Sequence, residues 1–137
     1  MKQIILSIKF LFILHFSQVS AEIFEIDNDK IAKLIKKDVP IIDIRTESEW
    51  KSTGIIPKSK MLTFFDKEGN FDSKKWMDQL KKIAKKNEPL IIICRSGRRS
   101  LIVANYLNSE AGYTTIYHAT NGILSWKAEQ KETIIPK

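Results

Sequence analysis

The only cysteine of the chain lies in a short and strongly basic segment. The segment consists of Cys94, Arg95, Ser96, Gly97, Arg98, Arg99 and Ser100. Gly97 permits backbone angles that let successive N–H groups turn inward toward an anion. A helix that begins near Arg99 would direct its positive end to the same place, and the three arginines add permanent charge. Because these features favour the thiolate of Cys94 over the thiol, the segment predicts an ionised, nucleophilic sulfur in an anion-binding loop.

The elements on either side of this loop are expected to position it. Leu90 to Ile93 form an unbroken apolar run directly before Cys94, which is typical of a strand buried on both faces in the centre of a parallel sheet. Residues 101–107 are expected to be helical. Ligands of open α/β sheets bind outside the carboxyl ends of the strands. The loop therefore lies where such a fold would carry its site.

The rest of the chain alternates between strand and helix patterns. Further strands are expected over residues 23–26, 39–44, 59–63 and 114–118. Further helices are expected after Asp27 or Asn28, over residues 46–50, from Asp72 or Ser73 through Ala84, and over residues 122–130. Strands separated by helices predict right-handed βαβ units and an α/β fold with a parallel sheet.

Length and composition limit the classes of protein that fit. The chain has 137 residues, of which 43% are hydrophobic and 28% charged, as expected for one globular domain. One cysteine and two histidines exclude a disulfide framework and argue against a metal site, so we expect none. The net charge of +7 is spread over lysine-rich helix faces without interleaved aromatic residues. We therefore expect no binding to nucleic acid.

The first 21 residues differ from the rest of the chain. A basic start at Lys2, short apolar runs and a Val19-Ser20-Ala21 ending predict a secretory signal peptide, followed by one domain over residues 22–137. The apolar stretch, interrupted by Lys9 and His15, falls short of the roughly 20 residues that span a membrane. We expect an exported monomer in the periplasm or cell envelope, without stable membrane association after cleavage. The alternative is an uncleaved anchor or a hydrophobic helix docked on the domain.

Three segments, in order, resemble the signatures of the rhodanese (sulfurtransferase) family over nearly all of residues 22–137. They are Asp43-Ile44-Arg45 with Glu49-Trp50 and Gly54-Ile55-Ile56-Pro57, the loop from Cys94 to Ser100, and Gly112-Tyr113 with Asn121-Gly122-Ile123 and Trp126. Three positions depart from the family pattern. Ile55 stands where histidine is usual, Lys58 where glycine follows the proline, and Asn121 where glycine is frequent.

This resemblance implies a three-layer α/β/α sandwich with a central, mostly parallel five-stranded sheet. It also implies a thiosulfate sulfurtransferase activity without a metal or organic cofactor. Cys94 would take the outer sulfur of a small donor, thiosulfate or polysulfide, carry it as a persulfide and pass it to cyanide or a thiol. Residues 95–100 would bind the donor, with Arg95 foremost because it adjoins the nucleophile.

Two other functions use a similar cysteine loop. Phosphatases and arsenate reductases have an arginine in a C-x5-R spacing, whereas Cys94 and Arg99 form the shorter C-x4-R, which suits a single sulfur better than a phosphate. A sulfur-carrier module with little turnover of its own would have the same loop. A thiol–disulfide oxidoreductase would need a second, resolving cysteine, which this chain lacks.

The charged residues after the second expected strand have a structural interpretation and a functional one. We expect an ion pair between Arg45 and Glu49, with Asp43 accepting hydrogen bonds from loop amides. In the functional alternative Asp43 belongs to the site, although a carboxylate beside the nucleophile would oppose thiolate formation. His118 is interpreted as a strand-end residue and is not assigned the role of a base.

Overall fold

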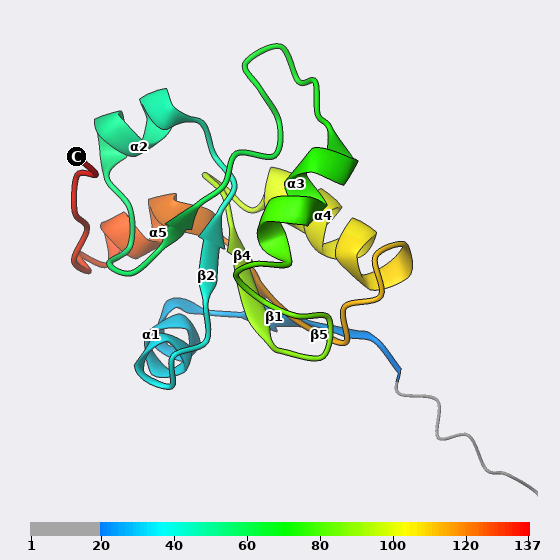
Figure 1. Cartoon of the computed structure of the whole chain (residues 1–137). Helices are drawn as coiled ribbons and strands as arrows, with labels where there is room; N and C mark the ends of the chain where they lie inside the picture. Colours follow the sequence, from blue (N-terminus) through cyan, green and yellow to red (C-terminus); the bar gives the residue numbers. More distant parts are fainter. Residues whose placement is uncertain (1–19) are drawn as a thin grey trace, which may run out of the picture.

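Strands and helices alternate along residues 20–137, the part of the chain that the computed structural model describes (Figure 1). The strands are β1 (Glu22–Ile26), β2 (Ile41–Asp43), β3 (Lys60–Met61), β4 (Leu90–Ile93) and β5 (Thr115–Ala119). The helices are α1 (Asn28–Lys36), α2 (Glu47–Thr53), α3 (Ser73–Leu80), α4 (Arg98–Ser109) and α5 (Gly122–Ala128). The predicted signal peptide lies outside the described residues except for its last two positions. No helix within residues 20–137 is long and apolar enough to cross a membrane.

The strands form one parallel sheet with the order β1-β5-β4-β2-β3. Every neighbouring pair runs in the same direction, so all carboxyl ends meet at one edge of the sheet. β4 occupies the central position between β5 and β2. The predicted α/β fold with a five-stranded parallel sheet is confirmed, and the loop after β4 lies at the centre of the ligand-binding edge.

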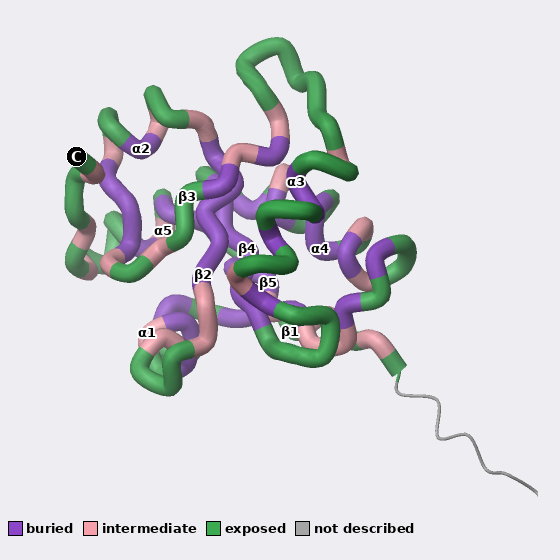
Figure 2. The backbone as a smooth tube through the Cα atoms, viewed as in Figure 1, coloured by how far each residue is buried: buried purple, intermediate pink, exposed green. Residues whose placement is uncertain are grey.

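Helices cover both faces of the sheet, and β4 shows how the layers form. All four of its residues are fully buried. Leu90 and Ile92 belong to the core cluster that α3 and α4 cover, whereas Ile91 and Ile93 belong to the cluster that α1 and α5 cover. Because successive side chains of a strand point to opposite faces, an unbroken apolar run fits both layers. The buried strand segments appear purple in Figure 2.

Aspartates fix the starts of two helices, as the sequence predicts. The Asp27 carboxylate accepts a hydrogen bond from the Lys30 N–H at 2.8 Å, and Asp72 caps α3 in the same way. The helix predicted to run through Ala84 instead ends at Leu80. The Ile83 N–H donates to the Leu80 carbonyl at 2.8 Å, three residues back. This tightened turn ends the regular helix while Ala84 remains buried.

Lys58 adopts the left-handed backbone conformation, with a φ of 70°. This is the position at which the family pattern has glycine, the residue that adopts this conformation most easily. Left-handed backbone costs a non-glycine residue about 1–2 kcal/mol, partly offset by the greater flexibility of glycine in the unfolded chain. We expect Lys58→Gly to raise the free energy of unfolding by about 0.5–1 kcal/mol in urea denaturation.

The matched control for this change is Lys60→Gly in β3. Lys60 is also exposed, but its φ is not positive, so the same substitution should lower stability. The Lys58–Asp38 ion pair spans 3.7 Å between exposed side chains and contributes little. A loss of stability in Lys58→Gly would show that the lysine side chain contributes more to the free energy of unfolding than relief of the backbone strain does.

Candidate active site

Two backbone N–H groups and one hydroxyl lie against the sulfur of Cys94. The Gly97 N–H donates to Sγ at 3.1 Å and the Ser100 N–H at 3.4 Å, and the Ser100 hydroxyl lies 3.2 Å away. Donors aimed at an acceptor stabilise its charged form. Cys94 itself is buried, with 1% of its surface exposed. The loop therefore holds one sulfur atom in a cradle of backbone N–H groups, as its sequence predicts.

Gly97 allows this loop to turn against the end of β5. Its φ is +100°, and a Cβ at this position would lie 2.0 Å from the Thr120 carbonyl oxygen. Gly122 has a φ of +61°, and its Cβ would lie 2.3 Å from the Arg95 carbonyl oxygen. Any side chain at either position would force the two loops apart. Both glycines are therefore required for the close approach that shapes the cradle.

The start of α5 fixes the loop from the other side. The Ile123 N–H donates to the Cys94 carbonyl at 2.9 Å, and the Leu124 N–H donates to the Arg95 carbonyl at 3.1 Å. These bonds hold the loop carbonyls away from the sulfur. The following N–H groups are then free to point toward Sγ. The start of α5 therefore supports the cysteine loop directly.

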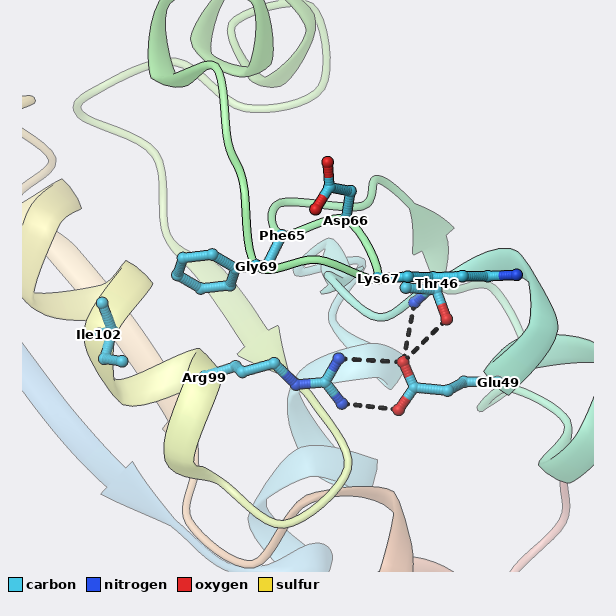
Figure 3. Close-up of a pocket in the computed structure, with 8 residues that line it drawn as sticks. All are labelled: Thr46, Glu49, Phe65, Asp66, Lys67, Gly69, Arg99 and Ile102. Atoms are coloured by element: carbon cyan, nitrogen blue, oxygen red, sulfur yellow. Dashed lines mark hydrogen bonds and ion pairs between the residues drawn. The ribbon is translucent and has the colours of Figure 1, made fainter.

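The arginines and Ser96 differ in their surroundings. Arg95, Ser96 and Arg98 are exposed, whereas Arg99 is partly buried. Arg99 forms two hydrogen bonds to the Glu49 carboxylate of α2, at 2.9 and 2.6 Å (Figure 3). Its guanidinium lowers the pKa of Glu49 to about 2, although partial burial opposes this. Arg99 is thus held by a carboxylate, while Arg95 and Arg98 remain available to an incoming anion.

A cavity of about 550 Å³ lies beside the loop (Figure 3). Phe65 and Ile102 contribute apolar surface, and the Arg99–Glu49 pair contributes charge. The other lining residues are Thr46, Asp66, Lys67 and Gly69. Arg99 is the loop residue that borders this cavity, and Cys94 is not among the lining residues. The cavity therefore borders the cysteine loop at Arg99.

Arg45 and Asp43 form a buried ion pair under the site. The guanidinium Nη2 lies 2.7 Å from Asp43 Oδ2, and Arg45 is fully buried. Arg45 also donates to the carbonyl of Gly54 at 2.9 Å and to the hydroxyl of Thr53. The predicted pair between Arg45 and Glu49 is wrong, because Arg45 turns inward under the end of α2. The Arg45 N–H donates to Asp43 Oδ1 at 3.1 Å, as expected of an aspartate that fixes the turn.

A histidine that sequence reasoning left out of the site is bonded to the cradle. The Nε2 atom of His118 lies 2.9 Å from the Ser100 hydroxyl, and Nδ1 lies 2.9 Å from a Glu25 carboxylate oxygen. In the parallel sheet His118 pairs with Ile92, two residues before Cys94. Side chains two residues apart share a face. The only feature of the sequence that could have indicated this contact was the position of His118 near the end of an otherwise largely apolar strand, which follows the cysteine loop in the chain.

No group of histidine, cysteine, aspartate or glutamate side chains within residues 20–137 is arranged to hold a metal ion. The groups that the described site brings together are a cysteine sulfur, backbone N–H donors, a hydroxyl, an imidazole and guanidinium groups.

The chain is similar to known proteins in sequence and in fold. The family model for the rhodanese-like domain matches residues 27–129. The thiosulfate sulfurtransferase GlpE of Pseudoalteromonas translucida is 33% identical over 101 residues, which cover 74% of this chain and 85% of the relative. A rhodanese-related protein of Thermoplasma volcanium superposes with a TM-score of 0.62 at 21% identity, over 82% of this chain and 99% of its own. The polysulfide-sulfur transferase of Wolinella succinogenes superposes with a TM-score of 0.63 at 21% identity, over 82% of this chain and 78% of its own.

Proposed function

The chain belongs to the rhodanese-like domain family, and from this premise we propose that it moves a sulfane sulfur from thiosulfate or polysulfide to a thiophilic acceptor. The observation that carries the proposal is the pair of N–H groups, from Gly97 and Ser100, that converge on Cys94 Sγ. A ring that fits one charged sulfur atom suits both a thiolate and the terminal sulfur of a persulfide.

The reaction has two half-reactions. The Cys94 thiolate attacks the outer sulfur of thiosulfate, the new S–S bond forms, and the old one breaks as sulfite leaves with its electron pair. An acceptor such as cyanide or a thiolate then attacks the terminal sulfur and leaves as thiocyanate or a persulfide, returning the Cys94 thiolate. No oxidant is consumed and no further cofactor is needed. Intact mass measurement after addition of thiosulfate should show a gain of about 32 Da on the chain.

Arg95 is the residue we assign to the sulfonate end of the donor. It is exposed and adjoins the nucleophile, whereas Arg99 is engaged by Glu49. A hydrogen bond to a charged group contributes about 1.5–3 kcal/mol. Arg95→Ala should therefore raise the KM for thiosulfate roughly tenfold or more and change kcat little.

Steady-state kinetics with thiosulfate and cyanide measure this effect. Lys74→Ala is the control, because Lys74 carries the same charge on α3 and its side chain is 90% exposed. It should leave both constants unchanged, which separates a local contact from a general effect of net charge. Unchanged thiosulfate kinetics in Arg95→Ala would show that Arg95 does not bind the donor.

A second candidate function is a sulfur carrier with little turnover of its own. The burial of Cys94, with 1% exposed, favours it because small acceptors would reach the sulfur slowly. A carrier would gain one sulfur per chain but show negligible repeated turnover with cyanide. A phosphatase is disfavoured, since Arg99 of the shorter loop is held by Glu49. Hydrolysis of an aryl phosphate faster than sulfur transfer would reverse that choice.

We further propose that residues 1–21 direct export and are removed, which would place the enzyme in the periplasm or cell envelope. The support is the basic, apolar and small-residue order of this segment. The same mass measurement on protein from the native cell would report cleavage after Ala21. A chain that retains Met1 would favour the anchor alternative.

A further inference from the structure

A chain of hydrogen bonds runs from the nucleophile to the surface of the protein. Cys94 Sγ lies 3.2 Å from Ser100 Oγ, which lies 2.9 Å from His118 Nε2. The other ring nitrogen, Nδ1, lies 2.9 Å from Glu25 Oε2. The His118 side chain is 3% exposed, whereas Glu25 is 54% exposed. A buried imidazole therefore connects the sulfur cradle to a surface carboxylate.

The two ring nitrogens of His118 face a carboxylate and a carbonyl, which can only accept, and a hydroxyl, which can also donate. Nδ1 faces the Glu25 carboxylate, and Nε2 lies 3.0 Å from the Gly97 carbonyl oxygen as well as close to Ser100 Oγ. A neutral ring can donate from Nδ1 to Glu25 and accept at Nε2 from the Ser100 hydroxyl, whereas a doubly protonated ring can donate to both Glu25 and the Gly97 carbonyl. The hydrogen-bond partners therefore accommodate His118 both before and after it takes a proton from Ser100.

Glu25 is well placed to balance the positive charge of the doubly protonated ring. The Thr120 hydroxyl donates to Glu25 Oε2 at 2.6 Å. This hydrogen bond, and secondarily the contacts with His118, hold the pKa of Glu25 below its ordinary value against partial burial. Glu25 thus stays a carboxylate near neutral pH. A carboxylate that orients a histidine and stabilises its protonated form is a common arrangement in acid–base chemistry.

We propose that His118 stores the proton of Cys94, received through the Ser100 hydroxyl, so that the resting site is a thiolate–imidazolium pair. The S–H bond of Cys94 breaks as its proton moves to Ser100 Oγ, and the Ser100 hydroxyl proton moves to His118 Nε2. Charge is conserved, and no other reactant is needed. Ser100 touches the reacting sulfur, whereas His118 and Glu25 are positioning residues that act through it. The inference deepens the proposed function, because it explains how the nucleophile of that reaction is generated.

The charged groups around these hydrogen bonds come from β1, α2, α4 and the loop after β4, which also carries the exposed Arg95. Glu25 belongs to β1, and Cys94 follows β4. On α4, Arg98 is exposed and Arg99 is paired with Glu49 of α2. The hydrogen bonds to Glu49 raise the pKa of Arg99, although partial burial opposes this. Arg99 thus adds positive charge near the sulfur at all working pH values, so the pH response we predict belongs to the Cys94–His118 pair.

The test follows ionisation of Cys94 directly and does not depend on sulfur transfer. In the full chain, the ultraviolet absorbance of the thiolate and the rate of alkylation by iodoacetamide are measured across pH. In His118→Gln, an amide can bond Ser100 but cannot take a proton. We expect alkylation to slow about tenfold near neutral pH and to converge with the wild type at alkaline pH, where the thiol ionises unaided. Glu25→Gln should show a smaller change in the same direction.

Matched controls separate a proton store from a structural contact. Glu22→Gln changes an exposed carboxylate on the same strand and should leave the profile unchanged. Nitrogen NMR of the ring gives a second measurement: Cys94→Ser, which removes the thiolate, should make His118 lose its proton at lower pH. A folded His118→Gln variant with the wild-type profile, or a His118 titration unaffected by Cys94→Ser, would overturn the proposal. Normal ionisation effects without any sulfur transfer would instead refute the proposed function alone.

Discussion

Cys94→Ser is expected to abolish sulfur transfer while leaving the fold intact. Serine is not ionised near neutral pH and cannot form a persulfide, and the chain has no other cysteine. Removal of a nucleophile from a preorganised site commonly lowers kcat by roughly 10⁴-fold or more. The oxygen can still accept hydrogen bonds from the Gly97 and Ser100 N–H groups. The free energy of unfolding should therefore change by only about 1 kcal/mol.

Four measurements together decide this prediction. Turnover of thiosulfate with cyanide should fall to the uncatalysed background, and the mass gain of one sulfur should disappear. Circular dichroism and urea denaturation should match those of the wild type. Ser109→Ala, which removes an exposed hydroxyl at the end of α4, is the control for handling and folding. A Cys94→Ser protein that still transfers sulfur would show that Cys94 is not the nucleophile.

Local patterns in the sequence determine the parts of this fold that could be predicted. The run Leu90–Ile93 marks the central strand because only a strand covered on both faces has no polar side. The cysteine, glycine and arginine residues that follow it are consecutive, so their geometry depends on one turn and one helix start. Gly97 does have the left-handed φ that an inward turn of the N–H groups requires. Such short-range features can be deduced from residue type alone.

The partners of the ionisable residues could not be deduced in this way. Arg45 and Glu49 are four residues apart, a spacing that suits an ion pair on a helix. Yet Arg45 lies before α2 and turns into the core, and Glu49 pairs with Arg99, fifty residues later. His118 and Glu25 meet because β1 pairs with β5 in register. These contacts depend on strand order, which sequence patterns leave open.

Asp43→Asn is expected to lower the free energy of unfolding by about 3–5 kcal/mol. The Asp43 carboxylate is the counter-ion of Arg45, and both side chains are at most 1% exposed. Asparagine can still accept one hydrogen bond, but it leaves the guanidinium charge uncompensated in the core. A domain of this size is stable by about 5–15 kcal/mol. The loss is therefore a large fraction of the total, and urea denaturation should show it as a much lower midpoint.

Two further variants identify the origin of this loss. Asp38→Asn removes a carboxylate from an exposed pair with Lys58, and it should change stability by no more than about 0.5 kcal/mol. The double variant Asp43→Leu with Arg45→Met removes both charges, and replacement of a buried pair by apolar residues is often nearly neutral. If the double variant is more stable than Asp43→Asn, the cost comes from the unpaired guanidinium. If it is equally unstable, the hydrogen bonds that Arg45 makes to Gly54 and Thr53 hold α2 in place, and the turn beneath the cysteine loop depends on them.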